Sequence, residues 1–239
     1  MKKKVLVLMM MATMVLSMGC GETKGGTNDK VSVNDGNETT DQGKEDAIDQ
    51  GTQENNEENE IVTLEEVMNH PVGSAKDFWI MEEDGEGIIY EYAGDEKIVV
   101  FPEEVEGIKV TAIDCNYRKM TAIRFPDSLV EIDSQTLFVN KSVQVVVFGE
   151  GLKKICNMSF ASCDGLREVK LNEGLEEIEY QCFMFCPNLK SVYVPESVTF
   201  IDGSSSFKGN AEDFVLKGKS GSYAETYANE NDIPFVAVD

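Results

Sequence analysis

The segment LREVKLNEGLEEIEYQCFMFCPN (residues 166–188) is one unit of a pattern that the chain repeats. Its apolar side chains recur at uneven intervals, which fit neither a single helix nor a single strand. Four consecutive units of 23 residues fill residues 120–211 and share five apolar columns. The columns are Met120, Val143, Leu166 and Leu189; Ile123, Val146, Val169 and Val192; Phe125, Phe148, Leu171 and Val194; Leu129, Leu152, Leu175 and Val198; and Ile132, Ile155, Ile178 and Ile201.

A sustained period of this length indicates a β-rich solenoid, in which each unit forms one coil and stacks on the next. A single coil buries too little apolar surface to offset the conformational entropy that it loses on ordering. Stacking joins each column into a continuous core, and short parallel strands such as residues 169–171 can hydrogen-bond from coil to coil. The expected fold is a leucine-rich-repeat solenoid of about five coils.

Several short motifs give the repeat a more specific resemblance. They are Ile123 with Phe125 and Pro126, Ser159 and Phe160 with Cys163, Cys182 and Phe183 with Cys186, and VPESVTFI at residues 194–201. Together with the C-terminal GSYAETYANENDIPFVAV (residues 221–238), they resemble the BspA-like leucine-rich repeats of bacterial and protozoan surface proteins. The resemblance covers roughly residues 85–239. It implies a surface protein that adheres to host or matrix proteins.

Three positions depart from that pattern. Leu137 stands where the repeat has its aromatic residue, and Asn140 stands where it has its cysteine. The fourth unit holds one extra residue, which moves its aromatic residue to Phe207.

Both ends of the array are expected to be irregular, because one side of each terminal coil faces water. Residues 61–119 are predicted to form an N-terminal cap with a degenerate first coil, in which Pro102 precedes Pro126 by 24 residues. Within this region, TLEEVM (residues 63–68) suggests a short helix, and Trp79 is expected to pack on the first coil.

The C-terminal cap is predicted over residues 212–239. Ser222 and Glu225 have the spacing of a capping box for a helix from residue 223 to residue 230. A strand over residues 233–238 follows. Together the helix and the strand would close the open end of the core.

The first twenty residues, MKKKVLVLMMMATMVLSMGC, have a basic start, an apolar stretch too short to span a membrane, and small residues before Cys20. They resemble a bacterial lipoprotein signal, which implies that residues 1–19 are removed and that lipid is attached to Cys20. Ser17 departs from this pattern, which usually has an aliphatic residue there. The alternative is an ordinary cleaved signal with an incidental cysteine.

Charge separates the next segment from the rest of the chain. Residues 21–60 carry twelve acids, three lysines and only four apolar side chains, so residues 20–60 are predicted to be a disordered tether. Residues 61–239 still carry a net charge of −17. Such a field repels nucleic acid and anionic lipid. We therefore expect no nucleic-acid partner, and contact with the membrane only through the lipid anchor.

Few residues suggest catalysis. His70 is the only histidine, so a Ser-His or Cys-His pair or a histidine metal site would have to use it, far from the array. Carboxylates are frequent, but Glu131, Lys154 and Glu177 share one column and predict a ladder of alternating charge between coils. We expect no enzyme activity, no cofactor and no metal.

The cysteines have two interpretations. Cys163 and Cys186 are 23 residues apart and Cys182 lies close by, which favours small core-filling side chains over a metal or redox site. Besides Cys20, the chain has five cysteines, and an odd number leaves at least one thiol unpaired in each chain. They are Cys115, Cys156, Cys163, Cys182 and Cys186. Which of them form disulfides stays open.

The best candidate for a binding site is the outward side of the first strand in each coil. Because strand side chains alternate, the neighbours of each buried residue face outward. They include Val145 and Val147, which are expected to form a mixed exposed patch with charged and aromatic neighbours. The candidate ligand-binding face comprises Arg124, Val145, Val147, Lys170 and Tyr193. The alternative is ordinary strand filling, since valine and tyrosine favour strands.

The sequence thus predicts a non-catalytic, lipid-anchored protein on the bacterial cell surface that presents its repeats to an extracellular protein or glycan. Two other hypotheses remain. One is a structural or assembly component of the cell envelope, and the other is an accessory module of a secreted enzyme.

Overall fold

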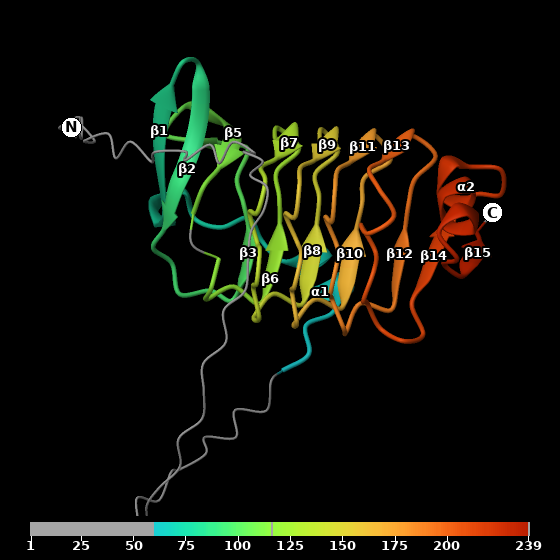
Figure 1. Cartoon of the computed structure of the whole chain (residues 1–239). Coiled ribbons are helices and arrows are strands. Elements are labelled where there is room, and N and C mark those ends of the chain that lie inside the picture. Colours follow the sequence, from blue (N-terminus) through green and yellow to red (C-terminus); the bar gives the residue numbers. More distant parts are fainter. Residues whose placement is uncertain (1–59, 116, 239) are drawn as a thin grey trace, which may run out of the picture. The chain divides into compact units, whose positions relative to one another are not determined.

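The computed structural model describes residues 60–115 and 117–238, which lie in one compact unit. They form a β-solenoid of about seven turns, counting the capping turns at both ends (Figure 1). The solenoid predicted from the 23-residue period is confirmed. The expected signal peptide, Cys20 and all of the tether except Glu60 lie outside the described residues.

The first strand of each coil forms a row along the solenoid (Figure 1). The row begins with a parallel sheet of β3 (Ile98–Val100), β6 (Ala122–Arg124), β8 (Val145–Val147) and β10 (Glu168–Lys170). It continues with β12 (Ser191–Tyr193), β14 (Val215–Gly218) and β15 (Phe235–Ala237). Ile123 pairs with Val146, and Val146 pairs with Val169. The sequence period is therefore also the pairing register of the sheet.

A second row of two-residue strands runs along another edge of the coils. It consists of β7 (Glu131–Ile132), β9 (Lys154–Ile155), β11 (Glu177–Ile178) and β13 (Phe200–Ile201). Lys154 pairs with both Glu131 and Glu177, which confirms the order of the charge ladder. Its ammonium nevertheless lies 2.6 Å from the carboxylate of Glu179 and 4.0 Å from that of Glu177. The shortest ion pair of Lys154 is therefore with Glu179, two residues after the expected partner Glu177.

The five apolar columns line one continuous core. All twenty of their side chains are buried, and the most exposed, Val169, keeps only 7% of its surface. Val146, Val169 and Val192 belong to the same hydrophobic cluster. Apolar surface that one coil could not cover alone is thus removed from water by the coils on either side.

An unbroken stack of aromatic rings runs through this core, although no single column is aromatic throughout. Phe101, Phe125 and Phe148 stack at the ends of the first strands, with ring centroids 5.9 and 5.6 Å apart. Phe160, Phe183 and Phe207 stack in the following turns, 5.4 and 5.6 Å apart. Phe148 meets Phe160 edge-on at 5.5 Å and joins the two stacks. The predicted shift of the aromatic residue to Phe207 is confirmed.

The N-terminal cap contains more regular structure than expected. The predicted short helix is present as α1 (Leu64–Asn69), and a 3-10 turn follows at Ala75–Asp77. A hairpin of β1 (Phe78–Glu83) and β2 (Glu86–Tyr92) then pairs with β5 (Ile108–Ile113), which also pairs with β4 (Glu104–Val105). Trp79, which we expected to pack on the first coil, lies on β1 and remains exposed.

The C-terminal cap agrees with its prediction except for the capping box. Helix α2 spans Tyr223–Glu230, and its Tyr227 ring packs edge-on against Phe207 with the ring centroids 6.1 Å apart. The Ser222 side chain makes no capping hydrogen bond, so the predicted box is wrong. Instead, the carboxylate of Glu225 accepts a 2.6 Å hydrogen bond from the backbone N–H of Gly221.

The cysteines of the described residues are all free thiols. The thiols of Cys163, Cys182 and Cys186 each donate to a carbonyl of the preceding coil, at 3.1 Å. Burial raises the pKa of Cys156 to about 12, which leaves its thiol protonated and unreactive at neutral pH. Among these residues, no three His, Cys, Asp or Glu side chains group as a metal site. Cys163, Cys182 and Cys186 belong to the main hydrophobic cluster and therefore pack as core-filling residues, as the sequence favoured.

The aromatic stack yields a stability test. Replacing Phe183 with alanine removes a fully buried ring from between Phe160 and Phe207, and should lower the free energy of unfolding by about 3–5 kcal/mol. Phe200 is 46% exposed on β13, so Phe200→Ala should change it by less than about 0.5 kcal/mol. Urea denaturation followed by circular dichroism measures both. Equal losses would contradict the central role of the stack.

Candidate functional site

The residues of the candidate ligand-binding face lie on the strands where they were predicted, but the face is not open. Val145 and Val147 on β8 are only 1% and 2% exposed. Helix α1 lies across β6 and β8 and places Val67 against these valines and Ala122 (Figure 1). The expectation of two exposed valines is wrong, because a helix from the N-terminal cap covers them.

The covering segment is residues 60–70, called the strap below. Its helix begins at a complete capping box, in which Thr63 and Glu66 bond to each other's backbone N–H groups. These hydrogen bonds lower the pKa of Glu66. His70 ends the helix, and its Nδ1 lies 3.2 Å from the carbonyl oxygen of Pro71. The only histidine thus occupies a helix end.

The charged members of the predicted face contact the strap. The guanidinium of Arg124 donates a 3.0 Å hydrogen bond to the carbonyl of Met68, and the ammonium of Lys170 lies 3.9 Å from the sulfur of Met68. Tyr193 is half-buried on β12, farther along the row. Four of the five predicted residues therefore lie together, but they contact the strap of the same chain and are not free for a ligand. They are Arg124, Val145, Val147 and Lys170.

A second surface, which was not predicted from the sequence, is exposed to solvent. It consists of residues 134–140, 157–163 and 180–186, called the turn face below. These three turns contain no Asp, Glu, Lys or Arg, although 27% of the whole chain is charged. Phe138, Val139 and Phe185 are exposed there, and Met158 and Met184 are half-buried.

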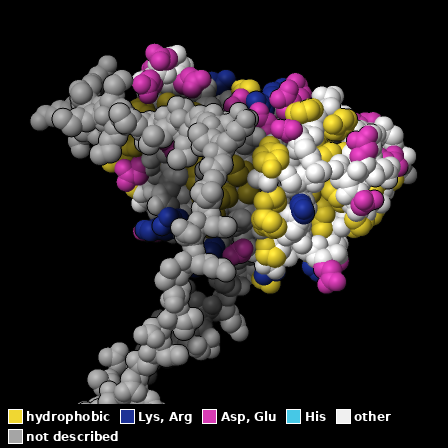
Figure 2. Space-filling model, in the orientation of Figure 1, with side chains coloured by type: hydrophobic (Ala, Val, Ile, Leu, Met, Phe, Trp, Pro, Cys, Tyr) yellow, Lys and Arg dark blue, Asp and Glu magenta, His cyan; other side chains and the backbone are white. Residues whose placement is uncertain are grey.

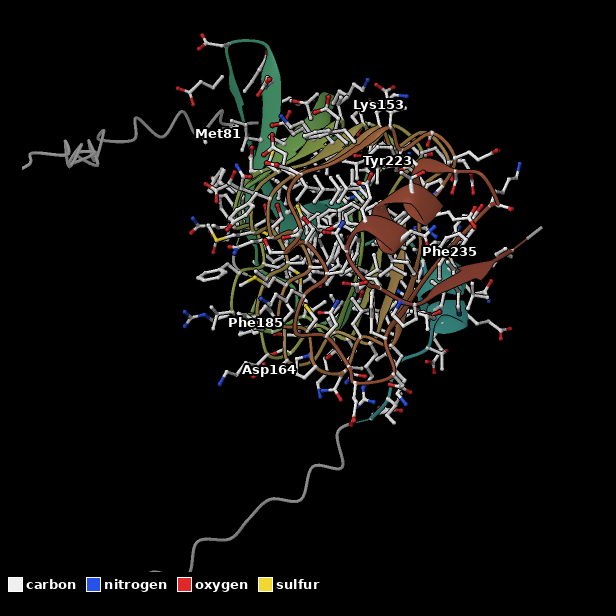
Figure 3. The ribbon with its side chains drawn as sticks, turned by 45° about the vertical axis from the view of Figure 1, so that its right-hand side comes forward. Met81, Lys153, Asp164, Phe185, Tyr223 and Phe235 are labelled. Carbon is white, nitrogen blue, oxygen red and sulfur yellow. The ribbon has the colours of Figure 1, made fainter. Side chains whose placement is uncertain are left out.

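The pictures place the turn face away from the strap. Figure 3 shows Phe185 on the opposite side of the coils from helix α1. Figure 2 shows hydrophobic side chains gathered on the coils on the side that faces the viewer. A cavity of about 460 Å³ lies at the N-terminal end of this surface, bounded by Phe138, Val139, Tyr117 and Lys141 among others. The turn face is thus an uncharged surface with exposed apolar side chains and a hollow at one end.

The backbone of the turn face is unusual. Alternate N–H groups donate to the next coil: those of Gln135, Leu137 and Val139 bond to carbonyl oxygens at 3.0, 2.7 and 3.0 Å. Each turn holds two residues in the left-handed region. They are Gln135 and Val139, Met158 and Ser162, and Gln181 and Phe185, with φ between 55° and 64°.

At two of these positions, the residue present makes the left-handed backbone conformation energetically unfavourable. Val139 is β-branched and Phe185 is bulky, and such residues rarely adopt a positive φ. The following turn has Gly209 at the same position as Phe185, with a φ of 75° that a glycine adopts without strain. Strained positions that keep large exposed side chains are frequent at functional sites. This supports a role for the exposed side chains of Val139 and Phe185 beyond holding the turn.

Part of this site could have been found in the sequence. The lack of charge in three aligned turns is visible in the repeat. Phe138 and Phe185 also fall outside the buried column of Leu137, Phe160 and Phe183. That both rings are exposed depends on the left-handed backbone of the turns, which the apolar spacing does not indicate.

Solved structures similar to this chain are bacterial repeat proteins. The T. pallidum leucine rich repeat protein TpLRR is 21% identical with a TM-score of 0.55, over 62% of this chain and 71% of that chain. A leucine rich cell surface protein from Faecalibacterium prausnitzii is 21% identical with a TM-score of 0.46, over 64% of this chain and 52% of that chain. The first likeness supports the fold alone. No curated protein matches the chain significantly.

The family comparison is more specific. The family described as the BspA type leucine rich repeat region matches residues 89–212 in six copies, which is more than half of the chain. The matched residues run from β2 through the coils to the start of the C-terminal cap. They include the whole of the turn face and all five apolar columns. The chain therefore belongs to the BspA type leucine-rich-repeat family.

Proposed function

We propose that this chain is a lipid-anchored protein of the bacterial cell surface that binds an extracellular protein or glycan through the turn face, without catalysis. Membership of the BspA type family supports a repeat protein used for binding. The lipoprotein-like signal before Cys20 and the acidic segment after it support an anchored domain held away from the membrane. Within the described residues, no helix has the length and apolar character needed to cross a bilayer.

The main argument for placing the binding site on the turn face is that its three turns contain no charged residue. Residues 61–239 have a net charge of −17, so an approaching acidic partner is repelled over most of the surface. The buried centres of protein interfaces are poor in charged residues and rich in aromatic residues and methionine. Phe138, Phe185, Met158 and Met184 give the turn face this composition.

The polar groups of the turn face suit the same role. Gln135, Thr136, Ser162 and Gln181 are exposed or half-buried among the apolar side chains. Amide and hydroxyl groups both donate and accept hydrogen bonds, so they can bond to a peptide backbone or to sugar hydroxyls. The exposed rings supply flat apolar area for either partner.

The family resemblance makes adhesion the expected role, and the experiment follows from the turn face. The double variant Phe138→Glu, Phe185→Glu places two charges on the surface and should weaken binding to host cells or matrix proteins at least tenfold. Phe200→Glu is the matched control, because Phe200 is 46% exposed, close to the 49% of Phe185, but lies on the row of short strands. It should bind like the unaltered chain.

The readout is binding of the labelled chain to cells, to immobilised matrix proteins and to a glycan array. Circular dichroism confirms that each variant is folded. Equal binding by the double variant and by Phe200→Glu would contradict a binding role for the turn face. Recovery of the cell's own envelope proteins alone would favour a structural component instead.

The anchor has its own test. In the producing bacterium, the unaltered chain should enter the detergent-rich phase on Triton X-114 separation, because lipid on Cys20 supplies a large apolar group. Cys20→Ser should move it to the aqueous phase. Cys115→Ser is the control, since Cys115 lies in the folded coils, and should stay with the detergent. An aqueous unaltered chain would contradict the anchor and favour an ordinary cleaved signal.

A further inference from the structure

We propose that the outer face of β6 and β8 is a peptide-binding groove that the strap, residues 60–70, occupies in the free protein. The partner that displaces the strap is a peptide segment of similar chemistry: an extended, acidic start, an apolar anchor and one helical turn. This groove lies on the other side of the coils from the turn face (Figure 3). It therefore does not depend on the function proposed above.

One apolar side chain anchors the strap. Val67 is fully buried between the helix and the outer side of the sheet, where it packs against Ala122, Val145 and Val147. These four residues form a cluster separate from the main core. The partly buried Val62 and Leu64 pack at its margin. Peptide-recognition grooves commonly hold the apolar face of a short helix, and Leu64 and Val67 supply that face here.

Besides the contact of Lys170 with the sulfur of Met68, the groove hydrogen-bonds to the backbone of the strap. The amide of Gln144 accepts a 3.1 Å hydrogen bond from the N–H of Val62 and donates one of 3.2 Å to the carbonyl of Glu60. Arg124 donates to the carbonyl of Met68 at the last turn of the helix. Every peptide offers these groups, so Gln144 and Arg124 can hold any segment that follows the same path.

The strap fills the groove incompletely. A cavity of about 910 Å³ lies between its N-terminal half and the loops that carry Lys119 and Gln144, and one of about 260 Å³ lies beside Met68. Ile61 and Met68 remain exposed. These surface hollows leave space beside the strap for side chains larger than its own. A partner with bulkier side chains would bury more surface there than the strap does.

Charge indicates the composition of the partner. The larger cavity is lined by Lys97, Lys119, Lys141 and Arg167, in a chain whose overall charge is strongly negative. The strap presents Glu60 and Glu66 to the same cavity. Glu96 and Asp164 also line it, with the Asp164 carboxylate 3.9 Å from the ammonium of Lys141. A partner with acidic residues before its apolar anchor matches this lining.

The strap can also detach from the coils without unfolding them. Helix α1 has six residues, which is too short to be stable in water without its contacts. Beyond the strap, the N–H of Gly73 donates a 2.9 Å hydrogen bond to the carbonyl of Val100, which fixes the chain to the first coil. The strap can therefore leave the groove while the segment after it keeps its place.

Peptide binding in trans tests the proposal. The full chain carrying Val67→Asp loses the anchor of its own strap, since a buried carboxylate is costly. A fluorescent peptide of residues 60–71 should then bind it at least tenfold more tightly than it binds the unaltered chain. The same peptide with Val67→Asp should bind neither. Val130→Asp, at an exposed site without strap contacts, should behave like the unaltered chain.

Amide hydrogen exchange measures whether the strap has left the groove in the Val67→Asp variant. The amides of residues 64–69 should lose protection in Val67→Asp while those of β8 keep it. A strap that stays protected, or a released strap with no peptide binding, would overturn the proposal. If β8 also loses protection, the milder Val67→Ser variant replaces Val67→Asp in both measurements. The Phe138→Glu, Phe185→Glu variant should leave peptide binding unchanged, which separates this groove from the turn face.

Discussion

Register between neighbouring coils is the constraint on which the rest of this molecule depends. Each 23-residue unit leaves its apolar columns open on two sides, and only a neighbour in the same register closes them. The strand pairs Ile123 with Val146 and Val146 with Val169 fix that register by backbone hydrogen bonds. The turns repeat it, because alternate N–H groups bond to the next coil there as well. Core, strands and turns therefore specify the same alignment.

The periodic part of the structure could be predicted from the sequence because each unit repeats the same spacing of apolar residues. The five buried columns and the shift of the aromatic residue to Phe207 followed from spacing. The bounds of the C-terminal helix were also right, although the capping box used to place them is not formed. The cover over Val145 and Val147 did not. Alternation placed these valines on the outer side correctly, but their partner lies far away in the chain. The bond from Val62 to Gln144 spans 82 residues and belongs to no repeat.

The turn face illustrates a different limit. Phe138 follows Leu137, which shares the buried column of Phe160, so the period separates Phe138 from the aromatic stack but does not show that its ring is exposed. Left-handed residues at Gln135 and Val139 direct the side chains between them, and hydrophobic spacing carries no signal for a positive φ at such residues.

Removing one coil tests the role of register most directly. Deletion of residues 145–167 joins Gln144 to Glu168 and leaves every apolar column aligned, so the shortened chain should unfold cooperatively when followed by circular dichroism. Deletion of residues 145–155, about half a unit, misaligns all later columns and should abolish that transition. Equal behaviour of the two deletions, whether both fold or both fail, would contradict the dependence of this fold on coil-to-coil register.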